Sequence, residues 1–277
     1  MTVQLLVSTM DGAFFKRGYQ PPFDDYLVIN QISRSSPCPS HWGGERNIDA
    51  ADSSVPPMGG PAGGAFDYNE TGLSKSRNRA LQHATADICV VGDDDVCHLP
   101  AAQEIIAGAF ADHPRADIIT FQARTPDGAP FKRYASRPRR HTRRSIMRVT
   151  SWEIALRTAP VRAAGLRFDE LFGLGADFPT GEENIFLMDA LRRGLHLRYI
   201  PAPIAIHPAE SSGADFSRPD LIAAKGAAFR RMFGAASPPL EMAFACKKHH
   251  LSGLSCRQFY RHMRRGRAAY DRRLKRA

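Results

Sequence analysis

Short apolar runs alternate with amphipathic segments along most of the chain. Residues 3–9, 26–32 and 87–92 are rich in β-branched and other apolar side chains, and each run is too short for a core helix. These runs predict buried strands. Residues 73–84 and 99–112 carry apolar side chains at helical spacing. Strands that alternate with helices in this way predict an α/β fold with a mostly parallel sheet.

The alternation continues towards the C-terminus, with strands expected over 116–121 and 196–200 and a helix over 181–193. Two segments interrupt it. Residues 35–65 hold many Gly, Pro and Ser and predict a long irregular loop, while residues 137–148 contain six closely placed arginines. The arginines would either flank an anionic acceptor or form a flexible basic loop, and the role of the long loop stays open.

The composition is that of an ordinary soluble protein. Hydrophobic residues make up 43% and charged residues 24% of the 277 positions. No apolar stretch approaches the roughly 20 residues of a membrane-spanning helix, and the N-terminus lacks a secretion signal. The five cysteines have no CxxC spacing, which argues against a disulfide framework and against a zinc site. We therefore expect a cytoplasmic protein with reduced thiols.

The excess positive charge lies in the C-terminal tail. Residues 247–277 hold 11 of the 38 Lys and Arg residues but only one of the 28 acids, so the formal charge of +10 belongs to the tail. An apolar stripe runs through the same segment at Phe259, Met263, Tyr270 and Leu274. The tail would either lie on an anionic membrane surface, which would make the protein peripheral on the inner face of the cell membrane, or pack on the body as a basic solvated helix.

Three consecutive carboxylates, Asp93, Asp94 and Asp95, directly follow the 87–92 strand, and we call them the acidic turn. Open α/β sheets bind ligands at the carboxyl ends of their strands. Adjacent carboxylates repel one another unless a cation or hydrogen-bond donors neutralise them, so the cluster predicts a divalent ion with oxygen ligands. The alternative is a solvated loop in which Asp95 caps the following helix.

Three further signals are weak individually. Glu182 and Glu183 begin a predicted helix, where they would either complement the helix dipole or accept a proton near a metal–diphosphate site. His207 follows an apolar run and would be a core histidine or a ligand. Arg77, in the first turn of the 73–84 helix, would hold an anionic nucleotide or belong to a solvated helix face.

The order of these pieces along the chain resembles that of the family-two glycosyltransferases of GT-A fold. The residues that carry the resemblance are Gly-Leu-Ser-Lys-Ser-Arg-Asn at 72–78, Gly-Asp-Asp-Asp at 92–95, Phe-Gly-Leu-Gly at 172–175, Gly-Glu-Glu-Asn at 181–184 and Ile-His-Pro at 206–208. Each piece is unspecific alone, but the combination is specific. The resemblance implies a GT-A domain over 1–215 and a C-terminal helical, basic extension over 216–277.

The activity that the resemblance implies is metal-dependent inverting transfer of a sugar from a nucleoside-diphosphate sugar, expected to be UDP-linked. The acceptor would be a hydroxyl of a glycan or of a lipid-linked saccharide in polysaccharide biosynthesis. The catalytic base would be Glu183 with Glu182 as its neighbour, and Mn²⁺ or Mg²⁺ would be held by Asp93, Asp95 and His207. The nucleotide sugar would be bound by Ser8, Thr9, Asn30, Arg77, Asp93 and Asp94.

Two rival functions follow from the same residues. A nucleotidyltransferase acting on sugar phosphates would also use paired acids and Mg²⁺, but it usually carries a Gly-rich basic loop after the first strand, where this chain reads Ser-Thr-Met-Asp-Gly-Ala-Phe-Phe. A non-catalytic nucleic-acid-binding protein would use the basic tail. The neutral body has no basic and aromatic residues interleaved at strand spacing, so binding of nucleic acid is not expected.

Overall fold

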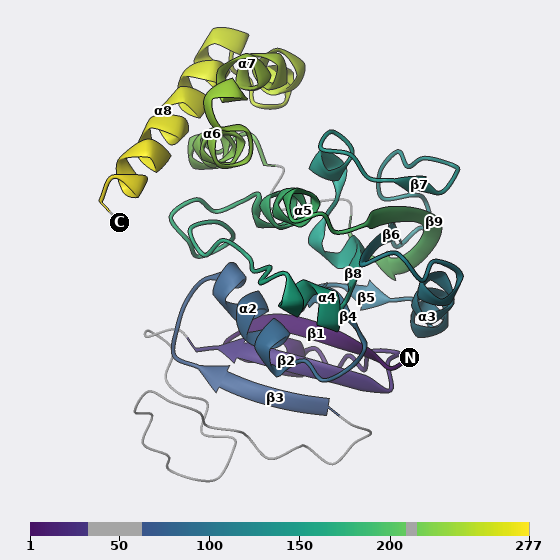
Figure 1. Cartoon of the computed structure of the whole chain (residues 1–277). Helices are drawn as coiled ribbons and strands as arrows, with labels where there is room; N and C mark the ends of the chain where they lie inside the picture. Colours follow the sequence, from purple (N-terminus) through teal and green to yellow (C-terminus); the bar gives the residue numbers. More distant parts are fainter. Residues whose placement is uncertain (33–62, 209–214, 277) are drawn as a thin grey trace. The chain divides into compact units, whose positions relative to one another are not determined.

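The computed structural model describes residues 1–32, 63–208 and 215–276 (Figure 1). Most of the loop expected over 35–65 lies outside these ranges. The chain divides into two compact units. Unit 1 consists of Met1–Thr71, Lys75–Arg167 and Asp189–Ala209. Unit 2 consists of Gly72–Ser74, Phe168–Met188 and Glu210–Ala277. The 168–188 segment, which the sequence placed with the first domain, thus clusters with the C-terminal helices.

Unit 1 is built on a mixed sheet, which has nine strands in the described part of the chain (Figure 1). Their order is β3-β2-β1-β4-β8-β6-β9-β5, with β7 paired to β9. The strands are β1 (Val3–Met10), β2 (Asp25–Gln31), β3 (Gly63–Tyr68), β4 (Ile88–Asp93), β5 (Cys97–His98), β6 (Ile118–Arg124), β7 (Arg139–Arg140), β8 (Ile154–Arg157) and β9 (Leu197–Ile206). This architecture confirms the α/β fold class.

The pairing of the central strands determines which residues meet at one edge of the sheet. β1 lies between β2 and β4 and is parallel to both, with Ser8 opposite Asp93 and Thr9 opposite Asn30. Strands buried on both faces need continuous apolar runs, which is why β1 and β4 were recognisable from the sequence. The carboxyl ends of these parallel strands therefore bring the predicted nucleotide-binding residues together with the acidic turn.

The second half of the sheet contains the antiparallel pairs. β8 pairs antiparallel with both β4 and β6, so β4 and β6 run in the same direction, and β6 is parallel to β9. β9 continues through Pro201 and Pro203, beyond the strand expected over 196–200. Its register with β6 shifts between Thr120 and Gln122, and such an irregularity accommodates residues that lack a backbone N–H.

The helices of unit 1 differ in detail from expectation. They are α1 (Ala13–Lys16), α3 (Ala102–Asp112), α4 (Thr158–Ala163) and most of α2 (Leu73–His83). α3 begins at Ala102 rather than at Leu99, and its N-cap residue Ala101 makes no side-chain capping bond. β3 includes residues 63–65 of the predicted loop, because strand pairing uses backbone groups that a Gly-rich sequence also supplies.

Unit 2 contains the C-terminal helices α6 (Pro219–Phe233), α7 (Ser237–Lys248) and α8 (Cys256–Leu274), which pack together (Figure 1). Phe259, Met263 and Tyr270 of the predicted apolar stripe are buried, and Phe259 contacts the rings of Phe216 and Phe244. Most of the stripe is therefore used for packing within the unit and is not available to a bilayer. In the ranges that the structure describes, no helix has the length and apolar character needed to cross a membrane.

The contact between α6 and α8 depends on two glycines. A Cβ on Gly226 would lie 2.0 Å from the carbonyl oxygen of Met263, and one on Gly266 would lie 1.7 Å from the carbonyl oxygen of Ala223. Both neighbours are helix backbone, which does not yield as a flexible side chain would. The two helices approach this closely because each has a glycine at the crossing.

We expect Gly226→Ala to destabilise unit 2, because the added methyl group forces α6 and α8 apart; overpacking of this kind costs about 1–3 kcal/mol or more. Gly108→Ala is the matched control. Gly108 is exposed on α3 and has no atom within 4 Å of its Cβ position, so this change stabilises a helix by about 0.5–1 kcal/mol. Thermal unfolding of both variants measures the effects, and equal melting temperatures would contradict the role of the helix crossing.

Candidate active site

The acidic turn lies at the carboxyl end of β4 in unit 1, and each of its three carboxylates has a different partner. Asp93 accepts hydrogen bonds from Arg77 Nη2 at 2.7 Å and from Ser151 Oγ at 2.8 Å. Arg77 is buried, with 4% of its side chain exposed, so its charge compensates Asp93 where water screens little. Two of the carboxylate's lone pairs are thus occupied by protein donors.

Asp94 is held by the end of β1. Thr9 Oγ1 donates to Asp94 Oδ2 at 2.7 Å and accepts from the backbone N–H of Phe14 at 3.0 Å. Arg17 donates to the backbone carbonyl of Asp94. Burial raises the pKa of Asp94, the Thr9 hydrogen bond opposes this, and the neighbouring carboxylates of Asp95 and Asp93 raise the pKa further. The pKa of Asp94 is therefore raised overall, because burial and the neighbouring acids disfavour its charged form.

Asp95 faces His207, which follows β9. The two side chains approach to 3.4 Å between Oδ2 and Nε2, and Asp95 is 64% exposed whereas His207 is 5% exposed. The hydrogen bond with His207 is the main reason why the pKa of Asp95 is lowered. Burial alone would lower the pKa of His207, but the bonds to Asp95 and to the Pro208 carbonyl outweigh it and raise the pKa. Asp95 therefore pairs with His207 and does not cap α3.

The imidazole of His207 is fixed in one orientation. Its ring stacks on Trp152, with centroids 4.1 Å apart and planes at 5°, and Phe131 contacts it edge-on at 5.6 Å. Nδ1 lies 2.7 Å from the carbonyl oxygen of Pro208. Because a carbonyl oxygen can only accept, Nδ1 carries a proton, and in the protonated ring Nε2–H donates to Asp95. Loss of the Nε2 proton leaves a lone pair there that a metal ion could accept. Metal-bound histidines commonly donate their second N–H to such a carbonyl.

The predicted nucleotide-binding residues at the ends of β1 and β2 gather beside the acidic turn. Ser8 is buried, and its hydroxyl has no hydrogen-bond partner among the described residues. Asn30 Oδ1 accepts from the backbone N–H of Gly12 at 2.9 Å, and Asn30 Nδ2 donates to Asp67 Oδ1 at 2.8 Å. Asp67 comes from β3, which the sequence had not predicted.

Glu182 and Glu183 lie in unit 2, at the start of α5 (Glu182–Arg192). The chain reaches them through Gly181, whose φ of 91° suits glycine. Glu182 is buried and Glu183 is half-buried. A Cβ on Gly173 would lie 3.4 Å from the Glu182 carboxyl carbon, so the Gly-rich loop closely approaches this carboxylate. That Glu183 faces the acidic turn stays a prediction, because the turn belongs to unit 1.

The donor set favours Asp95 and His207 as direct ligands of a divalent ion. No group of three or more His, Cys, Asp or Glu side chains suited to hold a metal occurs in the described ranges. Asp95 and His207 supply one oxygen and one nitrogen side by side, and few protein ligands leave positions for phosphate oxygens. The oxygens of Asp93 are engaged by Arg77 and Ser151, so its part in metal binding stays a prediction.

Sequence reasoning missed Arg17, Asp67, Phe131, Ser151 and Trp152. Their signals are weak: a lone arginine, an acid in a Gly-rich stretch, and a Ser-Trp pair after the arginine-rich segment. Each partner lies far from the acidic turn along the chain, so only the folded sheet brings them together. Ser151 and Trp152 are adjacent in a short 3₁₀ helix. The Ser151 hydroxyl contacts Asp93 and the Trp152 ring stacks on His207, so this single turn supports both residues.

The fold is similar to that of GT-A glycosyltransferases of known structure. The structure of PcManGT, a mannosyltransferase from Pyrobaculum calidifontis in complex with GDP-Man and Mn²⁺, is similar with a TM-score of 0.55 and 15% identity, over 96% of this chain and 74% of that one. S. aureus TarS 1-349 in complex with UDP-GlcNAc gives a TM-score of 0.54 and 13% identity, over 92% and 74%. At such identities the likeness shows the fold.

Residues 65–171 match the family model of glycosyl transferase family 2, which confirms the resemblance drawn from the motifs. The matched segment contains Arg77 and the acidic turn and ends before Glu182 and His207. No curated protein matches the sequence. A structure of S. aureus TarS that covers a longer chain is similar with a TM-score of 0.52 and 13% identity over 88% of this chain, which spans 42% of that longer one.

We expect Asp95→Asn to lower the pKa of His207, because the variant removes the charged partner while burial of the imidazole persists. Titration of the imidazole nitrogens by NMR, in protein stripped of metal with a chelator, measures the shift. Asp112→Asn is the control, since Asp112 is exposed at the end of α3. An unchanged His207 titration in Asp95→Asn would show that the two groups do not interact in solution.

Proposed function

We propose that the protein is an inverting glycosyltransferase that uses a nucleoside-diphosphate sugar, with UDP as the expected nucleotide. The observation that supports this most strongly is the Asp95–His207 pair beside the buried Arg77–Asp93 ion pair. Both pairs lie at the carboxyl edge of the sheet, where open α/β folds bind nucleotides. The turn and Arg77 also lie inside the segment that matches glycosyl transferase family 2.

The donor nucleotide would bind along the ends of β1, β2 and β3. Ser8 offers a buried hydroxyl that needs a partner, and an uncompensated buried polar group is costly. The Asn30–Asp67 pair adds an amide and a carboxylate, which suit the hydrogen-bonding edge of a base or a ribose. The hydrogen bond from Thr9 to Asp94 would hold the acidic turn, and the hydrogen bond from Arg77 would orient Asp93 towards the donor.

Asp95 and His207 would hold the Mn²⁺ or Mg²⁺ ion. A bound divalent ion supplies Lewis-acid neutralisation of the diphosphate, which is a poor leaving group while its charge is uncompensated. Neighbouring residues orient His207 for metal binding. Trp152 and Phe131 fix the imidazole ring, and the Pro208 carbonyl accepts a hydrogen bond from Nδ1, which leaves Nε2 available to the ion. PcManGT, which shares the fold, was observed with Mn²⁺ and GDP-Man.

Glu183 would act as the catalytic base, with Glu182 as its buried neighbour. The carboxylate would take the proton from the acceptor hydroxyl as that oxygen attacks the anomeric carbon opposite the leaving diphosphate. One displacement of this kind inverts the configuration. The acceptor would be a glycan or a lipid-linked saccharide, and the product would belong to polysaccharide biosynthesis.

The basic tail, residues 247–277, would bring the enzyme to lipid-linked acceptors on an anionic membrane surface. Because Phe259, Met263 and Tyr270 are buried inside unit 2 and Leu251 and Leu274 are exposed, such contact would be mainly electrostatic, with at most these two leucines at the surface. It would therefore weaken steeply as salt rises.

The proposed activity predicts that the protein releases free nucleoside diphosphate from a nucleotide sugar, slowly without acceptor, and only with Mn²⁺ or Mg²⁺ present. Screening UDP- and GDP-sugars with and without EDTA measures this. Asp95→Asn and His207→Ala should each raise the metal concentration required. Release of pyrophosphate from a nucleoside triphosphate and a sugar phosphate would instead indicate a nucleotidyltransferase, and a metal-independent, salt-sensitive gel shift would indicate a nucleic-acid-binding protein.

We expect Glu183→Gln to lose about 100- to 10,000-fold in turnover while donor binding survives, because the amide retains the shape of the side chain but cannot accept the proton. Glu104→Gln is the control, since Glu104 is exposed in the first turn of α3 and outside the site. Turnover and donor affinity are measured separately, by steady-state assay and by calorimetry. Near-normal turnover of Glu183→Gln would exclude this residue as the base.

A further inference from the structure

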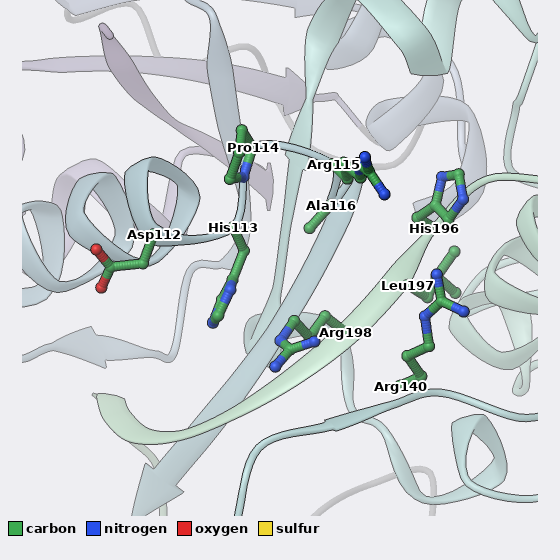
Figure 2. A pocket seen from close by; sticks show the side chains of 9 residues that line it. All are labelled: Asp112, His113, Pro114, Arg115, Ala116, Arg140, His196, Leu197 and Arg198. Carbon is green, nitrogen blue, oxygen red and sulfur yellow. The ribbon is translucent and has the colours of Figure 1, made fainter.

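Unit 1 contains a cavity at the sheet edge opposite the acidic turn. It has a volume of about 270 Å³ and lies where β6 and β9 begin and α3 ends (Figure 2). β4 and β6 run in the same direction, so the start of β6 and the end of β4 are at opposite edges of one sheet. The cavity is therefore separate from the proposed donor site.

Three arginines make the lining of this cavity positively charged, and we call it the arginine cavity. Arg115 follows α3, Arg140 belongs to β7, and Arg198 belongs to β9. None of the three has an acidic partner among the residues that the structure describes. The other lining residues include His113, His196, Pro114, Ala116 and Leu197.

The strand register forces two of these charges together. Arg140 and Arg198 are directly opposite each other in the antiparallel β7–β9 pair. Like charges at such positions destabilise a sheet unless something compensates them. Moreover, the Nε of Arg198 is shielded from solvent and has no hydrogen-bond partner in the described part of the chain. A buried guanidinium N–H without an acceptor is a further cost. A bound anion would compensate the like charges of Arg140 and Arg198.

The negative groups nearby do not compensate the arginines. Among the described residues, Asp112 is the only acid that lines the cavity, and its carboxylate points away from Arg140 and Arg198 (Figure 2). Asp117 is engaged by the backbone N–H of His196 at 2.7 Å. The C-terminal end of α3 contributes about half a negative charge. Arg157 partly offsets this negative charge, because its Nη2 donates to the Phe110 carbonyl oxygen at 2.9 Å. The three positive charges of the arginines therefore exceed the remaining negative charge of the helix end.

We propose that the arginine cavity binds an anion that carries a phosphoryl group, at a site additional to that for the nucleotide sugar. Guanidinium groups match phosphate oxygens with paired N–H donors, which a set of three can provide from separate directions. The volume is slightly below the range of about 300–1,000 Å³ usual for small-molecule pockets, so the cavity suits a phosphate with a small substituent rather than a whole nucleotide sugar. The phosphate belongs either to a lipid headgroup or to a soluble phosphoester.

Binding is tested on the full chain with inorganic phosphate as the probe, at constant ionic strength maintained with chloride. The Arg198 Nε–H resonance should shift and saturate as phosphate is added. Arg115→Gln should weaken phosphate binding about tenfold, because a hydrogen-bonded charge pair is lost. Arg198→Gln removes the resonance that reports binding, so this variant is tested by thermal unfolding. Phosphate should raise its melting temperature less than it raises that of the unaltered protein. Arg137→Gln is the control, because Arg137 is exposed and does not line the cavity.

A second arm distinguishes the two sources of the phosphate. Co-sedimentation with phosphatidylglycerol-containing vesicles is compared with co-sedimentation with phosphatidylcholine vesicles. If Arg115→Gln and Arg198→Gln reduce binding to the anionic vesicles more than Arg137→Gln does, the ligand is a lipid headgroup. If only inorganic phosphate binding falls, the ligand is a soluble phosphoester. The absence of a saturable Arg198 shift in the unaltered protein, or equal phosphate binding by Arg115→Gln and Arg137→Gln, would overturn the proposal.

Discussion

Three carboxylates in a row at the end of a buried strand repel one another unless each has its own compensating group. Asp93 is paired with the buried Arg77, Asp94 with Thr9, and Asp95 with His207. The three partners come from α2, β1 and the end of β9, so the acidic turn connects elements from most of unit 1. The central strands must keep their register for these contacts to persist, because a slip of one residue in β1 would carry Thr9 away from Asp94.

The partners also give the three acids different roles. Asp93 and Asp94 accept hydrogen bonds from the protein itself, and these bonds hold the turn in its conformation. Asp95 is the exposed member of the cluster and faces His207, whose imidazole is held in orientation by two aromatic rings and a carbonyl. The arrangement leaves one oxygen donor and one nitrogen donor directed at the same space, which suits a divalent ion with open positions for phosphate.

Charge is distributed unevenly over the same sheet. Negative groups gather where β4 ends, and uncompensated arginines gather where β6 and β9 begin. Both clusters follow from strand direction and register, since residues distant in sequence meet at the edge that their strands share. In unit 2 most of the apolar stripe of α8 is buried, while most of the arginines of that helix are exposed and Arg267 pairs with the buried Glu241.

The sequence by itself determined the strand runs, the α/β class and the position of the acidic turn, because these depend on local apolar patterns and on chemistry within a few residues. It also indicated His207 and Arg77 as members of a site that the sheet then assembled. The tertiary structure alone decided the support of that site by Ser151, Trp152 and Asp67, and the pairing of Arg140 with Arg198. It also decided that α6 and α8 cross at Gly226 and Gly266. Such contacts join residues far apart in the chain, and only strand register and helix packing bring them into contact, which no local pattern encodes.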